Sequence, residues 1–150
     1  MRLGIITGGG DCPGLNAVIR AAVRKGVGVH GHTFMGFRDG WKGVVEDDSL
    51  GLGIPQITGI LHRGGTILGS SGMNPFRVDG GVEAVEATFE RRGLDGLIAI
   101  GGEGTLGAAA GHASRRRRTQ RARRSAWLPN AATIVSSCRG CAATIVPRLQ

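Results

Sequence analysis

Two passages of this sequence run from an apolar strand through a glycine loop into a helix, and they constrain the fold more than any other feature. The first spans residues 2–27, with its glycine loop at 8–14, and the second spans residues 94–110, with its loop at 101–105. Such passages build α/β domains, in which ligands bind at the carboxyl ends of parallel strands. We therefore predict an α/β fold with a parallel sheet and flanking helices.

The segments between the two passages predict further elements. The pattern favours a strand at 32–37, a short helix from Pro55, a brief strand or turn at 66–68 and a helix at 81–92. In the last of these, Val82, Val85 and Phe89 fall at helical spacing and form the inward face. The stretch 44–53 is ambiguous.

Charge divides the chain at about residue 110. The 150 residues carry a formal net charge of +8, yet all 11 acidic residues and 26 of the 28 glycines lie in residues 1–110. Residues 111–150 hold nine arginines and no Asp, Glu or Lys. We therefore predict a folded segment over 1–110, followed by an Arg/Ala-rich, poorly ordered tail over 111–150.

The composition also excludes several classes of protein. The glycines have no three-residue period, so the chain is not collagen. No apolar run reaches the length of a bilayer span, and the N-terminus does not resemble a signal peptide, so we expect no membrane partner. Three cysteines without a framework spacing indicate a reducing compartment, which predicts a cytoplasmic location.

The glycine loops predict anion binding. Backbone N–H groups without neighbouring Cβ atoms approach a phosphate closely, and the following helix adds positive potential. Neither loop matches the P-loop or the dinucleotide-binding pattern. Each loop carries one carboxylate, Asp11 and Glu103, which repels phosphate unless a cation bridges them, so Mg²⁺ is implied. Tight turns in a glycine-rich protein are the alternative interpretation.

Three motifs stand out in the sequence: TGGGDCPGLN at 7–16, RGGTILGS at 63–70 and IGGEGT at 100–105. They resemble motifs of the 6-phosphofructokinase family, in its bacterial, ATP-type, actinobacterial-like form. Their order and spacing match, and the resemblance covers about residues 1–110. It implies the front part of that family's nucleotide-binding lobe. It also implies transfer of the ATP γ-phosphoryl group to fructose 6-phosphate, with Mg²⁺, in a homo-oligomer.

The resemblance assigns roles to individual residues. It places the Gly10 backbone against the nucleotide phosphates, Asp11 in the metal and phosphate region, and the Trp41 ring on adenine. Packing of Trp41 at an edge of the core is the alternative interpretation. Glu103 would bind Mg²⁺. The residues that would line the phosphates in the second loop are Gly102, Gly104 and Thr105.

Two positions bear on the phosphoryl donor. Glycine at 104 resembles the ATP-dependent members, whereas pyrophosphate-dependent members have Asp there, so ATP is expected and pyrophosphate stays an alternative. After Ser71, where the family usually has an Arg beside the phosphates, this chain has Gly72 and Met73. Loss of that guanidinium would cost on the order of 2–4 kcal/mol of transition-state stabilisation.

The family's catalytic base is the first Asp of an IDND-like motif, and this sequence has no such motif. No Asp follows Asp95, so we predict no catalytic residue in these 150 residues. We interpret the tail as an out-of-frame translation and the chain as truncated and inactive alone. A non-catalytic ATP- or phosphate-binding remnant is a second hypothesis. Nucleic-acid binding by the arginines is a third, and we do not expect it to be the tail's function.

Overall fold

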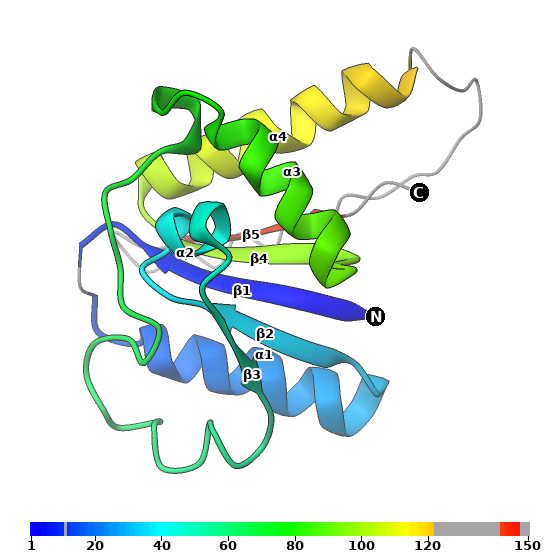
Figure 1. Cartoon of the computed structure of the whole chain (residues 1–150). Coiled ribbons are helices and arrows are strands. Elements are labelled where there is room, and N and C mark those ends of the chain that lie inside the picture. Colours follow the sequence, from blue (N-terminus) through cyan, green and yellow to red (C-terminus); the bar gives the residue numbers. More distant parts are fainter. Residues whose placement is uncertain (11, 122–141, 148–150) are drawn as a thin grey trace.

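The computed structural model describes residues 1–10, 12–121 and 142–147, which form one five-stranded sheet with helices on both faces (Figure 1). The strands are β1 (Arg2–Gly8), β2 (Thr33–Phe37), β3 (Ser49–Leu52), β4 (Gly96–Gly101) and β5 (Ala142–Pro147). The helices are α1 (Leu15–His30), α2 (Trp41–Glu46), the 3₁₀ turn η1 (Pro75–Arg77), α3 (Gly81–Arg92) and α4 (Glu103–Arg121). The strand order is β3-β2-β1-β4-β5.

The centre of the sheet is parallel, and both edges are antiparallel. β1 pairs in parallel with β2 on one side and with β4 on the other. β3 and β5 pair antiparallel with β2 and β4. The predicted α/β fold with flanking helices is confirmed, and the edge strands make the sheet mixed rather than wholly parallel.

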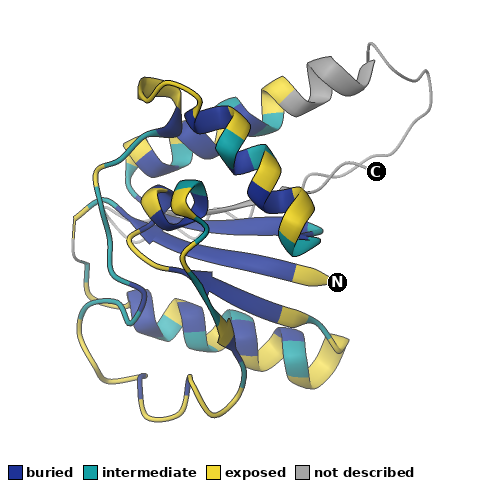
Figure 2. Cartoon of the chain, in the orientation of Figure 1, coloured by how far each residue is buried: buried dark blue, intermediate teal, exposed yellow. Residues whose placement is uncertain are grey.

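The pleat of the strands divides the core between the two faces of the sheet. Ile5 lies in the cluster under α1, with Ile19 and Phe34, whereas Ile6 lies in the cluster on the opposite face, with Trp41 and Phe89. The central strands are buried along nearly their whole length (Figure 2). Burial on both faces explains why these strands are continuous apolar runs in the sequence.

One short element differs from its prediction. No helix begins at Pro55: residues 54–59 form consecutive turns, in which Ile57 is buried although the backbone is not helical. Glycines at 53 and 59 bracket this segment, and Gly59 has a φ of +76°, which a continuing helix does not allow. Of the two alternatives predicted for 66–68, a brief strand or a turn, the structure has the turn.

Two elements of regular structure include described residues beyond residue 110. Helix α4 continues without a break through residue 110 to Arg121, and β5 forms at 142–147. Ala and Arg have high helix propensity, and the β5 sequence AATIVP is rich in β-branched residues, so local preference accounts for both elements. The division of the chain at residue 110 stays a prediction. Within the described residues, no helix combines the length and the apolar character needed to cross a bilayer.

Candidate functional site

The two glycine loops meet at the carboxyl ends of adjacent parallel strands. Gly8, the last residue of β1, lies opposite Gly101, the last residue of β4. Contact between the loops is close: a Cβ on Gly101 would overlap with the Gly8 carbonyl oxygen, and a Cβ on Gly8 would overlap with the Thr105 side chain. Gly101 has no room for a side chain because the Gly8 backbone lies against it, whereas a side chain at Gly8 is excluded by the side chain of Thr105.

Segment 63–72 lies against the first glycine loop. The buried Thr7 hydroxyl donates to the Gly69 carbonyl (2.7 Å) and lies 2.8 Å from the Thr66 hydroxyl. The Gly9 N–H donates to the Ser71 carbonyl (3.4 Å). The segment carrying the second predicted motif thus forms a third side of the same site.

Asn16, in the first turn of α1, connects this segment to the helix. Its amide nitrogen donates to the carbonyls of Arg63 (3.0 Å) and Gly64 (3.3 Å), and its Oδ1 accepts the N–H of Ile67 (2.8 Å). Because the side chain is buried, these bonds replace contacts with water and fix the conformation of segment 63–67.

The surface enclosed by the three segments is largely bare backbone. A Cβ atom built on any of four exposed or half-buried glycines would meet no atom within 4 Å, and these are Gly10, Gly72, Gly102 and Gly104. The first hydrogen bond of α4 runs from the Leu106 N–H to the Gly102 carbonyl (3.1 Å), so the amides before Leu106 have no partner within the helix. Open space beside helix N-terminal amides suits an anion such as phosphate.

Glu103 is exposed in the first turn of α4, at the edge of this surface. The predicted partner Asp11 lies outside the described residues. Among the residues that the structure describes, no group of three or more metal-ligating side chains converges. A divalent ion here would be held by Glu103 and by phosphate oxygens of a ligand, which is the coordination that Mg²⁺ commonly adopts. The residues present fit that ion.

The prediction that the Trp41 ring stacks on adenine is wrong for this structure. Trp41 is only 1% exposed, and its indole N–H donates to the Thr105 carbonyl (3.2 Å). Its ring packs in the core cluster between the sheet and α2, α3 and α4, so no face is open to a base. Met73 packs against the same cluster but is only half-buried, and Gly72 is exposed.

Sequence reasoning missed four residues that organise the site. They are Thr7, Asn16, Asp39 and Ser71. The Ser71 hydroxyl donates to the Asp39 carbonyl (2.6 Å), and the Asp39 N–H donates to the Leu68 carbonyl (2.8 Å). For Asp39 the available signal was the Asp-Gly pair that follows β2 after Arg38, because parallel strands end at one edge of a sheet.

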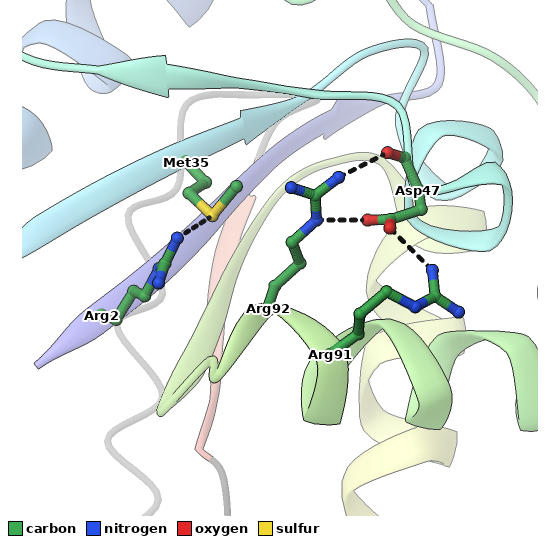
Figure 3. A network of polar contacts seen from close by, with 5 residues as sticks. All are labelled: Arg2, Met35, Asp47, Arg91 and Arg92. Atoms are coloured by element: carbon green, nitrogen blue, oxygen red, sulfur yellow. Dashed lines mark hydrogen bonds and ion pairs between the residues drawn. The ribbon is translucent and has the colours of Figure 1, made fainter.

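An ion-pair cluster joins the far end of α2 to α3 (Figure 3). Asp47, which caps α2 with a φ of +60°, accepts from Arg91 Nη1 (2.6 Å) and Arg92 Nε (2.7 Å). Partial burial favours a raised pKa for the Asp47 carboxyl, but the hydrogen bonds and charges of Arg92 and Arg91 outweigh it and hold the pKa below 3.8. The hydrogen bond and the negative charge of Asp47 in turn raise the pKa of Arg92.

A separate open groove of about 740 Å³ runs between α1 and turns 54–59. Its polar lining includes Arg20, Arg24 and Lys25, and it shares no lining residue with the glycine loops. The groove is therefore distinct from the site at the strand ends.

The fold and the meeting of glycine loops at the ends of β1 and β4 define an α/β protein with a candidate ligand site at the carboxyl edge of the sheet. Residues 2–146 match the model of the family described as phosphofructokinase, and the chain belongs to that family.

Relatives in this family differ in the donor that their names give. The chain is 60% identical over 109 residues to a pyrophosphate–fructose 6-phosphate 1-phosphotransferase of Amycolatopsis mediterranei. It is 57% identical over 109 residues to an ATP-dependent 6-phosphofructokinase of Streptomyces coelicolor. In both cases the match covers 73% of this chain and 32% of the relative, so the chain spans about a third of their length.

A solved structure of similar fold is Pichia pastoris phosphofructokinase in the T-state. The TM-score is 0.72 at 33% sequence identity, over 76% of this chain and 12% of that chain.

Proposed function

We propose that the chain binds the phosphoryl donor of a phosphofructokinase, as Mg·ATP, on the surface formed by the two glycine loops and segment 63–72. The observation that carries the proposal is the opposition of Gly8 and Gly101 at adjacent strand ends, beside open backbone at Gly10, Gly102 and Gly104. Backbone amides there orient the phosphates. Bound Mg²⁺ would neutralise charge on the phosphate oxygens.

Glu103 is the residue proposed to hold the metal. Its carboxylate opposes an anion unless a cation lies between them, so binding of ATP should depend on Mg²⁺. Replacing Glu103→Gln should remove most of that dependence, whereas Glu90→Gln, at an exposed position on α3, should leave it unchanged. Asp11 is proposed as a second contributor on the resemblance alone.

Pyrophosphate is the second candidate donor: the names of three relatives at 56–60% identity favour it, whereas a relative at 57% identity is named ATP-dependent. Gly104 favours ATP, because an aspartate there would fill the space beside the phosphates and add negative charge. Calorimetric titration with Mg·ATP and with Mg·pyrophosphate distinguishes the two. Gly104→Asp should weaken ATP binding at least about tenfold and affect pyrophosphate less.

Gly107→Asp is a matched control for that variant. Gly107 is exposed on α4, one turn beyond Gly104, and a side chain there would meet nothing within 4 Å. It therefore changes the charge of the same helix without entering the proposed site. Equal loss of ATP binding in Gly104→Asp and Gly107→Asp would contradict the assignment of the donor to these loops.

Three further parts of the proposal are carried over from the family: fructose 6-phosphate as the acceptor, assembly into a homo-oligomer and a cytoplasmic location. Because no aspartate follows Asp95, we propose that these 150 residues bind the donor without transferring its phosphoryl group. A coupled assay with ATP or pyrophosphate and fructose 6-phosphate should give no turnover above background, and turnover lost on Glu103→Gln would contradict this.

A further inference from the structure

The beginning of α2 is pressed against both glycine loops. Gly40, just before the helix, has a φ of +64°, and a Cβ there would lie 2.8 Å from the Thr7 carbonyl oxygen at the end of β1. The next residue, Trp41, donates its indole N–H to the Thr105 carbonyl at the start of α4 (3.2 Å). Two consecutive residues at the start of α2, its N-cap Gly40 and its first residue Trp41, thus contact the two strand–loop–helix passages.

The loop at 101–105 has few side chains that hold its conformation. Three of its five residues are glycines, and side chains at Gly102 and Gly104 would meet no neighbouring atom. Its last three residues begin α4, in which the Leu106 N–H donates to the Gly102 carbonyl. Thr105 is buried and anchors this turn, through its side chain against Gly8 and through its carbonyl to Trp41. What holds Thr105 therefore contributes to the order of the preceding amides.

We propose that Trp41 is a positioning residue: its indole N–H fixes the Thr105 carbonyl and thereby sets the amides of 102–105 in the geometry that the phosphoryl donor requires. This inference rests on the proposed function of the loop. The indole acts from inside the core, through the loop backbone, and does not touch the donor. Preorganised donors bind an anion more tightly because they need no ordering when the ligand arrives.

The alternative is that Trp41 only fills the core. The two roles differ when the N–H is removed and the ring is kept. In a Trp127→Phe background, Trp41 is the single tryptophan of the chain, and it can be replaced biosynthetically by benzothienylalanine, whose sulfur replaces the indole N–H. Trp41→Phe is the simpler genetic variant. Phe34→Leu, buried under α1 on the other face of the sheet, is the control for loss of core volume.

The first readout is amide hydrogen exchange in the ligand-free protein. Removing the N–H should accelerate exchange at residues 106–109, the first amides that are hydrogen-bonded within α4, by about three- to tenfold, the equivalent of one neutral hydrogen bond, with little change in α3. Phe34→Leu should lower global stability without selective acceleration at 106–109. Unchanged exchange at 106–109 in the benzothienylalanine protein would overturn the inference, whatever ligand the loop takes.

The second readout is the dissociation constant for Mg·ATP and Mg·pyrophosphate by calorimetry, at a temperature where every variant is folded. The benzothienylalanine protein should bind about three- to tenfold more weakly than its Trp127→Phe parent, and Phe34→Leu should bind within twofold of the unmodified chain. Equal weakening in Phe34→Leu would overturn the positioning role. A parent chain that binds neither donor would overturn the proposed function, and the exchange measurement separates these two failures.

Discussion

The close contact between Gly8 and Thr105 gives a direct test of how the two loops are built. A Cβ on Gly8 would overlap with Thr105 Oγ1 and lie 3.1 Å from Thr105 Cγ2, but 3.4 Å from Thr105 Cβ. The first two atoms disappear in Thr105→Ala, and the third is at ordinary van der Waals distance. Gly8→Ala should therefore be tolerated only when Thr105 is also shortened.

The size of the expected stability loss follows from the overlap that the added methyl group would create. Forcing an extra methyl into this buried contact should lower the free energy of unfolding by about 1–3 kcal/mol. In the Thr105→Ala background the same substitution should cost less than about 0.5 kcal/mol, because the space is then free. The expected coupling energy is therefore about 1–2 kcal/mol.

Urea denaturation of the four proteins of this double-mutant cycle measures the coupling. Gly51→Ala is the control for the general effect of glycine replacement in a strand, because Gly51 is exposed on β3 with open space around it. It should change stability by no more than about 0.5 kcal/mol. Additivity of Gly8→Ala and Thr105→Ala within about 0.5 kcal/mol would refute the contact between the loops.

Two further substitutions probe the supports of the site. Asn16→Ala leaves the Ile67 N–H and the Arg63 carbonyl without their partner, so it should destabilise the chain by about 1–3 kcal/mol and accelerate tryptic cleavage at Arg63. Resistance to trypsin equal to that of the parent would contradict the role of Asn16 in holding segment 63–67. Asp47→Asn should lower the urea midpoint at pH 7. Because the pKa of Asp47 is depressed in the folded state, the stabilisation that its carboxylate provides is complete above pH 3.8 and is lost as the pH falls below that value. The urea midpoints of the two proteins should therefore converge in acid. A constant difference between them down to pH 2 would contradict the ion pair with Arg92.

The periodicity of the apolar residues predicted the helices and strands that bury a whole face. The runs of β1 and β4 and the spacing in α1 and α3 are long enough to be read without tertiary information. The carboxyl ends of the strands also followed, because each apolar run stops at glycines. The position of both loops at the same edge of the sheet could therefore be expected, whereas their adjacency follows only from the pairing of β1 with β4.

The remaining elements depend on tertiary contacts. β3 is a four-residue edge strand whose alternation is too short to recognise, and Ile57 and Ile60 have helical spacing but are buried by turns. Trp41 has the position of an adenine-stacking aromatic in the sequence pattern, yet its carbonyl partner, Thr105, lies 64 residues away. A hydrogen bond of that separation leaves no local signal.

The central claim is that the glycine loops bind a phosphoryl donor, and amide chemical shifts measured during a titration test it most directly. On addition of Mg·ATP, the largest changes should fall at residues 8–10, 71–73 and 102–106, which surround the open backbone. Omitting Mg²⁺ should weaken these changes. Saturable changes confined to the groove of Arg20, Arg24 and Lys25, with the glycine-loop amides unmoved, would contradict the account.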